Sequence, residues 1–163
     1  MRVKNLLGRK TAALAFAAVM ALGLAACYPA NTSADGPPDP YANQLFQALN
    51  RDRANVGLPP LTYSPRLAET AQNWAIQMAG AGVLYHQDLT SLLYSDRFAG
   101  YWTLGENIMV GPGNMSADQV EAAWRNSPPH WANITSGAFN VVGIGFVHGP
   151  DGRIWAVQDF GAV

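Results

Sequence analysis

Two of the three histidines in this 163-residue chain belong to an ordered pattern of polar residues that are spaced along the sequence. His86 precedes a Gly-Glu-Asn-Ile motif that contains Glu106, and His130 ends a Ser-Pro-Pro-His motif. Neutral imidazoles and carboxylates are common zinc ligands, and three such ligands leave a fourth position open for water or a substrate. The same groups transfer protons in general acid–base catalysis. If the fold brings His86, Glu106 and His130 together, we expect a site that holds a divalent metal, zinc being the first candidate, or moves a proton.

These residues also have structural explanations. A buried carboxylate such as Glu106 can be held by backbone N–H groups and organise a loop. Ser127 lies close to His130, as a serine nucleophile would. It precedes a proline at an expected helix start, however, and no nucleophile-elbow motif surrounds it. We therefore interpret Ser127 as a capping residue, and we interpret His148 as a solvent-exposed residue of a hairpin turn. His130 would then lie in the first helical turn, where the helix dipole keeps the imidazole neutral.

Residues 1–26 have the pattern of a signal peptide, which is removed from the mature protein. Basic residues precede an alanine-rich apolar stretch, 11–24, that is too short to span a bilayer comfortably. The stretch leads into Leu-Ala-Ala-Cys, which resembles the lipobox of bacterial lipoproteins, although an ordinary signal peptide with a chance cysteine would look similar. We predict a lipid on Cys27, a proline-rich tether over 27–39, and a single domain over 40–163 that is anchored to the cell membrane outside the cytoplasm.

The charge of the predicted mature chain excludes some partners. Removing the signal peptide leaves six of the ten basic residues and all eleven acidic ones, for a net charge of −5 and no lysine. A chain of this charge lacks the basic surface that neutralises phosphates, so we expect no nucleic-acid partner. We expect attachment to the membrane to come from acyl chains and not from charge. The single cysteine is Cys27, so the domain must be stable without disulfides.

Caps and apolar periodicity predict helices flanking a small antiparallel sheet. Helices are expected after the Asp-Pro and Ser-Pro steps at 39–40 and 64–65, and after a Ser-x-x-Gln capping box at 116–119. A short helix within 88–98 and a strand at 106–110 are weaker predictions. The end of the chain predicts a hairpin, with strands at 141–147 and 153–160. This combination indicates an α+β fold.

The ordered motifs of residues 40–161 resemble the CAP superfamily, also called the SCP domain, and in particular its bacterial branch. That superfamily includes cysteine-rich secretory proteins, antigen 5 and plant pathogenesis-related proteins. The resemblance implies an α-β-α sandwich around the antiparallel sheet. It rests on the motifs at 49–53, 58–61, 105–108, 127–130, 133–134, 142–145 and 158–161, with His86 and Trp124.

The resemblance also implies a central cavity that is lined by two histidines and two acidic residues and binds a divalent metal in several members. His86 matches the first histidine, Glu106 matches the acid of the Gly-Glu-Asn motif, and His130 matches the histidine of the bacterial motif. Ser127 replaces the second acid, and residues 155–158 lack the strand histidine of eukaryotic members. The implied site therefore has three ligands.

Three functions remain open from the sequence. The first is a cleft that binds a ligand, with or without a metal: a small lipid or sterol, a peptide or a cell-wall component. The second is a metal-assisted hydrolase of peptide or cell-wall material, and the third is a structural envelope protein without turnover. The sequence favours binding over catalysis and leaves enzymatic activity undecided, because a fold alone does not choose among these functions.

Overall fold

The computed structural model describes residues 36–163, so the predicted signal peptide, Cys27 and most of the tether lie outside the described residues. No helix within this range is long and apolar enough to cross a membrane. In chain order the elements are α1 (Pro40–Asn55), β1 (Thr62–Tyr63), α2 (Pro65–Ala81), α3 (Leu89–Leu93), the 3-10 helix η1 (Asp96–Phe98), β2 (Thr103–Pro112), α4 (Ala117–Arg125), α5 (Pro128–Ile134), β3 (Val141–His148) and β4 (Arg153–Ala162).

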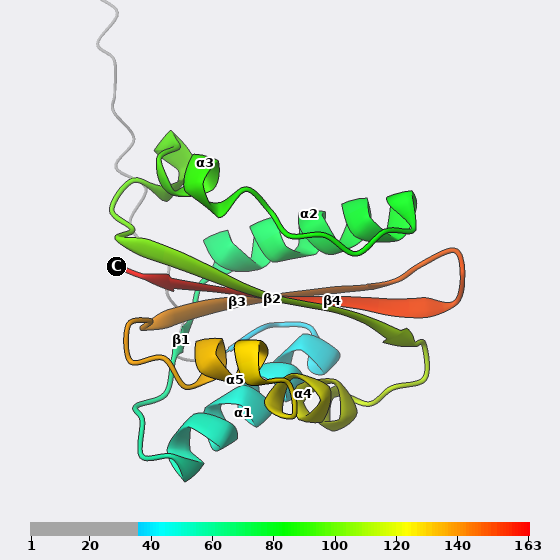
Figure 1. Cartoon of the computed structure of the whole chain (residues 1–163), viewed down its shortest axis with the longest axis horizontal. Helices are drawn as coiled ribbons and strands as arrows, with labels where there is room; N and C mark the ends of the chain where they lie inside the picture. The colour runs from blue at the N-terminus through cyan, green and yellow to red at the C-terminus, as the bar shows by residue number, and fades with distance from the viewer. Residues whose placement is uncertain (1–35) are drawn as a thin grey trace, which may run out of the picture.

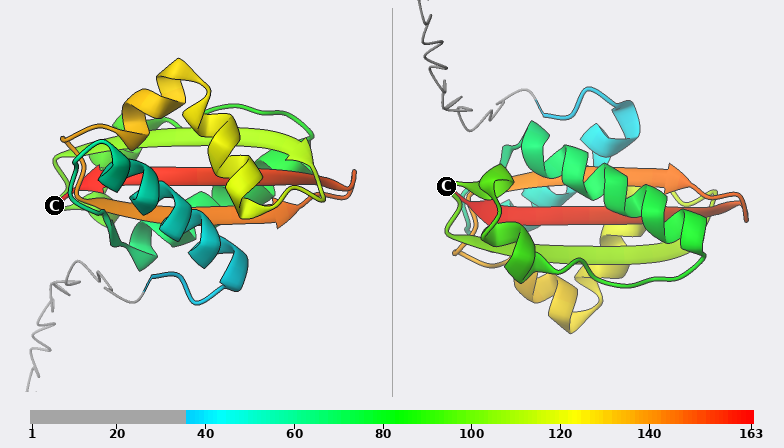
Figure 2. Two further views of the ribbon diagram at one scale, coloured as in Figure 1. Left: turned by 90° about the horizontal axis from the view of Figure 1, so that it is seen from below. Right: turned by 90° about the horizontal axis from the view of Figure 1, so that it is seen from above.

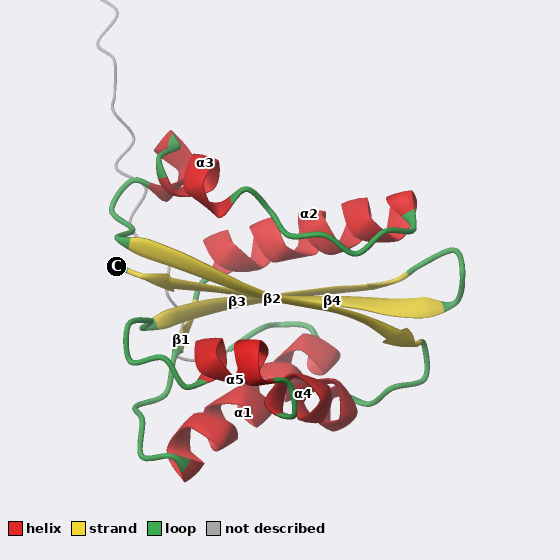
Figure 3. Cartoon of the chain, in the orientation of Figure 1, coloured by secondary structure: helices red, strands yellow, loops and turns green. Residues whose placement is uncertain are grey.

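The elements form three layers, with helices on both faces of a four-stranded sheet (Figures 1 and 3). α2 and α3 lie on one face, and α1, α4 and α5 lie on the other. The strand order is β1-β3-β4-β2, and β4 pairs antiparallel with both neighbours. This arrangement confirms the predicted α+β sandwich. The two-residue strand β1 pairs parallel with β3, which the sequence analysis did not predict.

The predicted caps explain where three of the helices begin. Asp39 Oδ1 accepts hydrogen bonds from two backbone N–H groups of the first turn of α1, at 2.8 and 2.9 Å. Ser64 caps α2 in the same way, and Ser116 with Gln119 forms the predicted capping box of α4. Ser127 stands at the start of α5, but its hydroxyl makes no cap hydrogen bond. The prediction that Ser127 caps this helix therefore holds for its position and is wrong for its side chain.

Apolar side chains fill the space on each side of the sheet. The larger cluster lies between the sheet and the α1, α4 and α5 layer, and it includes Leu45, Trp124 and Phe160. A second cluster joins α2 to the sheet through Met78 and Trp155. The predicted apolar faces of the helices are therefore the faces that bury the sheet.

Two glycines let α2 lie directly on β3. A Cβ atom at Gly143 would lie 2.0 Å from the backbone nitrogen of Ala68, and one at Gly145 would lie 2.2 Å from that of Gln72. Any larger residue at either position would push the helix away from the strand. α2 consequently runs along the sheet over β3 and β4 (Figure 2).

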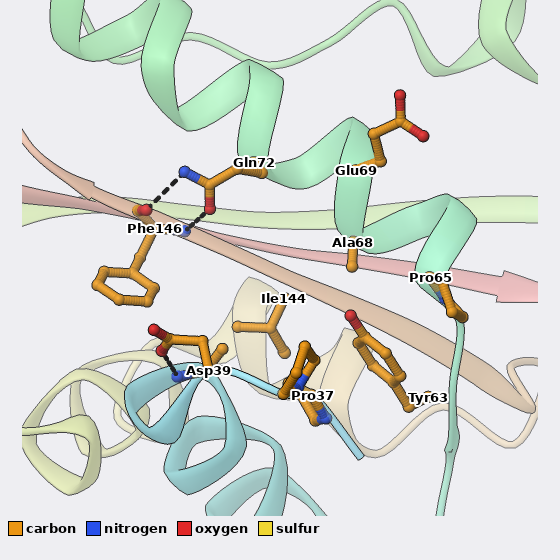
Figure 4. Close-up of a pocket in the computed structure, with 11 residues that line it drawn as sticks. Pro37, Asp39, Tyr63, Pro65, Ala68, Glu69, Gln72, Ile144 and Phe146 are labelled. Carbon is orange, nitrogen blue, oxygen red and sulfur yellow. Dashed lines mark hydrogen bonds between the residues drawn. The ribbon is translucent and has the colours of Figure 1, made fainter. Parts of the chain in front are cut away.

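The outer edge of β3 is covered by a side chain where β1 ends. β1 pairs only with Val141 and Val142. Farther along the strand, the Gln72 side chain donates to the Phe146 carbonyl at 2.8 Å and accepts from the Phe146 N–H at 3.0 Å (Figure 4). Gln72 thus makes the pair of hydrogen bonds that a neighbouring strand would make. A groove of about 370 Å³ lies beside this edge, between α1 and α2.

Candidate functional site

His86 and Glu106 meet at the opposite edge of the sheet. His86 lies in the segment between α2 and α3, and Glu106 lies in the edge strand β2. His86 Nδ1 is 2.6 Å from Glu106 Oε1. The His86 side chain is 60% exposed, whereas the Glu106 side chain is 0% exposed. A buried carboxylate therefore orients an exposed imidazole.

Gln87 ties Glu106 to a second buried carboxyl group, that of Asp159. The backbone N–H of Gln87 donates to Glu106 Oε1 at 3.1 Å, and Nε2 donates to Glu106 Oε2 at 2.7 Å. The same Nε2 lies 3.0 and 3.1 Å from the two Asp159 oxygens. Glu106 and Asp159 are directly opposed in the β2–β4 ladder, which places both carboxyls on one face of the sheet. One amide group thus binds two acids from neighbouring strands.

Burial raises the pKa of Asp159 well above its ordinary value, and the nearby charge of Glu106 raises it further. The hydrogen bond from Gln87 acts in the opposite direction. Two adjacent buried carboxyls cannot both ionise without a large cost, so the neutral form is favoured at Asp159. The site therefore contains an acid whose proton is retained at higher pH than that of an exposed aspartate.

Gln87 and Asp159 were not among the site residues predicted from the sequence. Asp159 had a detectable signal, because an aspartate inside the apolar strand at 153–160 must find a partner when the strand is buried. Gln87 had none beyond its position next to His86. Its role depends on the strand register, which brings two carboxyls within reach of one side chain.

His130 approaches from the other helix layer. It lies in the first turn of α5, and its carbonyl accepts a hydrogen bond of 3.1 Å from the Asn107 side chain. Its Nδ1 atom is buried and has no hydrogen-bond partner within residues 36–163. Burial lowers the pKa of His130, and the nearby His86 lowers it further. The direction agrees with the prediction of a neutral imidazole, but its largest cause is burial and not the helix dipole.

The structure joins two of the three predicted metal ligands directly. His130 and His86 are close enough for their charges to interact, yet no hydrogen bond links His130 to His86 or to Glu106. Both Glu106 oxygens already accept hydrogen bonds, so in this arrangement the carboxylate orients its neighbours. In the part of the chain that the structure describes, no group of three or more His, Cys, Asp or Glu side chains is placed to hold a metal ion. Metal binding by His86, Glu106 and His130 therefore stays a prediction.

His148 lies outside this cluster. It is exposed at the end of β3, as predicted, and its ring Nε2 donates to the Gly113 carbonyl at 2.9 Å. The predicted lipidation site, Cys27, falls outside the described residues.

Comparison with known proteins decides the family. Residues 46–160 match the family model described as "CAP: Cysteine-rich secretory protein family". The chain belongs to the CAP family. The resemblance found in the sequence motifs is thereby confirmed.

Relatives of this CAP domain occur in bacteria and plants. YkwD of Bacillus subtilis (strain 168) is 31% identical over 137 residues, which are 80% of this chain and 51% of YkwD. Pathogenesis-related protein 1C of Nicotiana tabacum is 30% identical over 89 residues, which are 54% of this chain and 45% of that protein. The chain therefore spans about half the length of these curated relatives. A solved extracellular protein containing an SCP domain, from Bacillus anthracis str. Ames, matches with a TM-score of 0.60 and 24% identity. The match covers 78% of this chain and 45% of that protein's chain.

In this CAP domain, the asparagine of the Gly-Glu-Asn motif organises the opposite face of β2. Asn107 donates to Gln158 Oε1 at 3.0 Å and accepts from the Asn133 side chain at 2.9 Å. Gln158 in turn donates to Glu121 Oε2 at 2.7 Å. Burial raises the pKa of Glu121 to about 8, with a further contribution from Asp52. A continuous chain of buried hydrogen bonds thus links α5, β2 and β4 to α4.

A pocket of about 560 Å³ adjoins the His86 cluster on the α2 side of the CAP domain. Trp74 and Gln87 both contribute to its lining. Trp74 is half-buried and contacts the ring of Tyr85 with centroids 4.7 Å apart. Gln87 therefore lines the pocket while it holds the two buried carboxyls.

Proposed function

We propose that this chain is a ligand-binding CAP domain held outside the cytoplasm, and that its ligand binds beside His86 and Gln87. The observation that carries the proposal is the double role of Gln87, which lines a pocket of about 560 Å³ and bonds the carboxyls of Glu106 and Asp159. Small-molecule sites commonly combine a concave surface of this size with a few convergent polar groups. Carboxyls with perturbed pKa values also gather at functional sites.

Co-purification tests this proposal. Ligand recovered with the protein from cell-envelope extract is identified by mass spectrometry, and recovery is compared between the unmodified protein and Gln87→Leu. Gln47→Leu is the matched control, because Gln47 is an exposed glutamine of α1. We expect recovery with the unmodified protein and the control and a loss of at least tenfold with Gln87→Leu. Equal recovery from both variants would place the ligand elsewhere, and no ligand from any extract would favour a structural envelope protein.

The extracytoplasmic location is part of the proposal. It is supported by the pattern of the signal peptide, by the lipobox-like Leu-Ala-Ala-Cys and by the relative that is described as an extracellular SCP-domain protein. A lipid on Cys27 would hold the domain at the membrane surface through the tether of residues 27–39. Metabolic labelling with palmitate should mark the protein, and Cys27→Ala should abolish the label and release the protein from the membrane fraction.

A divalent metal remains a separate proposal for the same region. His86 Nε2 and the ring nitrogens of His130 have no hydrogen-bond partner in the described range, so they are the imidazole nitrogens that could bind a metal. A carboxylate that orients a metal-binding imidazole is a common companion of such sites, and Glu106 has this relation to His86. Calorimetric titration with zinc, compared with His86→Ala and His130→Ala, tests the metal. An absence of binding at micromolar zinc would remove it.

One observation favours a second candidate function, hydrolysis of peptide or cell-wall material. Since a carboxylate accepts hydrogen bonds, the Glu106 contact places the hydrogen on His86 Nδ1 and leaves the lone pair of Nε2 facing outward. Paired carboxylate and imidazole groups of this kind act as general bases. Turnover of a peptide or muropeptide library that disappears in a folded Glu106→Gln variant would support catalysis, and a library left intact by the unmodified protein would exclude it.

A further inference from the structure

One face of α2 lines the pocket with amide groups. Residues 70, 73, 74 and 77 follow a spacing of i, i+3, i+4 and i+7, so they share a side of the helix. Asn73 and Gln77 are exposed, and their side-chain amides have no hydrogen-bond partner among residues 36–163. Each amide offers both a donor and an acceptor, as an acetamido group or a pair of neighbouring hydroxyls requires.

Arg97 supplies a cationic group at one wall. Its Nη2 is 2.8 Å from Glu69 Oε2, and its Nε donates to Thr70 Oγ1 at 3.2 Å. Its Nη1 has no partner among the described residues, and the side chain is 40% exposed. These contacts fix the guanidinium and leave an N–H edge available for a carboxylate.

Asp88 also lines the pocket and supplies an anionic group. Its two oxygens accept hydrogen bonds from the Ser91 N–H at 3.0 Å and the Ser91 hydroxyl at 2.6 Å. These bonds lower the pKa of Asp88 and so favour the ionised carboxylate. Each carboxylate oxygen has a further lone pair that can accept a hydrogen bond from a ligand hydroxyl. With one cation and one anion in the lining, the pocket does not favour a polyanion such as a nucleotide.

Trp74 and Leu92 give the pocket its apolar surface. The indole Nε1 donates to the Tyr85 carbonyl at 2.8 Å, which fixes the ring orientation. A purely apolar ligand would cover Asn73 and Gln77 without satisfying their amides, and burying unpaired amides is costly. The lining therefore suits a ligand that has an apolar C–H surface surrounded by hydroxyl and amide groups.

We propose that this pocket binds an acidic N-acetylated sugar, with its carboxylate at Arg97, its acetamido and hydroxyl groups at Asn73, Gln77 and Asp88, and its C–H surface against Trp74. This inference rests on the proposed ligand-binding function and names the class of ligand.

Two sugars that differ in one group test the inference. N-acetylmuramic acid carries a lactyl carboxylate that N-acetylglucosamine lacks, and both can be titrated into the ¹⁵N-labelled protein by NMR. We expect N-acetylmuramic acid to bind at least tenfold more tightly and to shift the side-chain amide signals of Asn73 and Gln77. Arg97→Gln should abolish the difference between the sugars, and Trp74→Leu should weaken both. Arg153→Gln is the matched control, because Arg153 is also half-exposed and paired with an acid but belongs to the β3–β4 hairpin and does not line the pocket.

Three results would overturn the inference. The first is equal affinity for the two sugars, and the second is shifts confined to residues outside the pocket. The third is tighter binding of a dipeptide such as alanyl-glutamate, which would assign the pocket to peptides and leave the ligand-binding function standing. If Trp74→Leu does not fold, the exposed Gln77→Ala serves instead, and it should weaken both sugars. The ligand-binding function itself fails separately, if no ligand of any class co-purifies with the protein.

Discussion

Replacing Glu121 with glutamine should remove a loss of stability that the protein suffers as the pH rises from 5 to 7. The Glu121 side chain lies in α4 under the sheet, and the residue is 1% exposed. Oε2 accepts a hydrogen bond from Gln158, while Oε1 has no partner in the described part of the chain. Burial, followed by the charge of Asp52, raises the pKa of Glu121 from 4.5 to about 8. Glutamine keeps the acceptor for Gln158 and cannot ionise.

The sign of the effect follows from proton binding. Between pH 4.5 and about 8 the folded protein holds a proton on Glu121 that the unfolded chain has released. The free energy of unfolding therefore falls as the pH rises through this window. The stabilisation that the retained proton gives is complete only below pH 4.5, the ordinary pKa of Glu121. One pKa unit corresponds to about 1.4 kcal/mol. Glu121 should therefore lower the free energy of unfolding by roughly 2 kcal/mol as the pH rises from 5 to 7.

Urea unfolding followed by tryptophan fluorescence measures this cost. The unfolding free energies of the unmodified protein and of Glu121→Gln are compared at pH 5, 6 and 7. Asp159 also has a raised pKa, but it is present in both proteins and cancels in the difference. The advantage of the glutamine variant should grow by about 2 kcal/mol over this range. A difference that stays constant with pH would refute the reasoning, because Glu121 would then titrate alike in the folded and unfolded states.

Three further predictions concern other parts of the domain. Gly143→Ala should lower the unfolding free energy by about 3 kcal/mol or more, since its Cβ would lie 2.0 Å from the Ala68 nitrogen. Gly137→Ala is the control, because its Cβ would meet nothing within 4 Å. Ser116→Ala should lower the unfolding free energy by about 1 kcal/mol through loss of the capping box, which thermal unfolding would detect. An NMR titration of His130 should give a pKa below the ordinary 6.5, because burial and then the charge of His86 lower it. The free energy of unfolding should rise as the pH rises from the folded pKa toward 6.5, since the unfolded chain binds more protons in that window. A raised pKa would contradict the assignment.

Local chemistry predicted the helices well. Asp39, Ser64 and Ser116 each begin a helix because a side-chain oxygen satisfies backbone N–H groups that the helix leaves free. Such signals lie within a few residues of one another in the chain, so they are visible without the fold. The two-residue strand β1 gives no comparable signal, since its parallel pairing with β3 depends on residues 79 positions away.

The candidate site was predicted only in part for the same reason. The motifs identified His86 and Glu106, which the structure joins at 2.6 Å. The contribution of Asp159 depends on the register of β2 against β4, and that of Gln87 depends on both carboxyls being present. His130 was placed correctly in the first turn of α5, but sequence could not show that its Nδ1 is buried without a partner.

The hydrogen bonds of Gln72 have a consequence for encounters between copies of this protein. An exposed strand edge invites pairing with the same edge of another molecule, which leads to aggregation. β1 covers the start of the β3 edge and Gln72 covers Phe146. Because backbone groups alternate in direction along a strand, Ile144 is the position between them whose N–H and C=O also face outward. One open residue is too short to nucleate strand addition, so Gln72 closes the β3 edge of the sheet to pairing with a neighbouring copy.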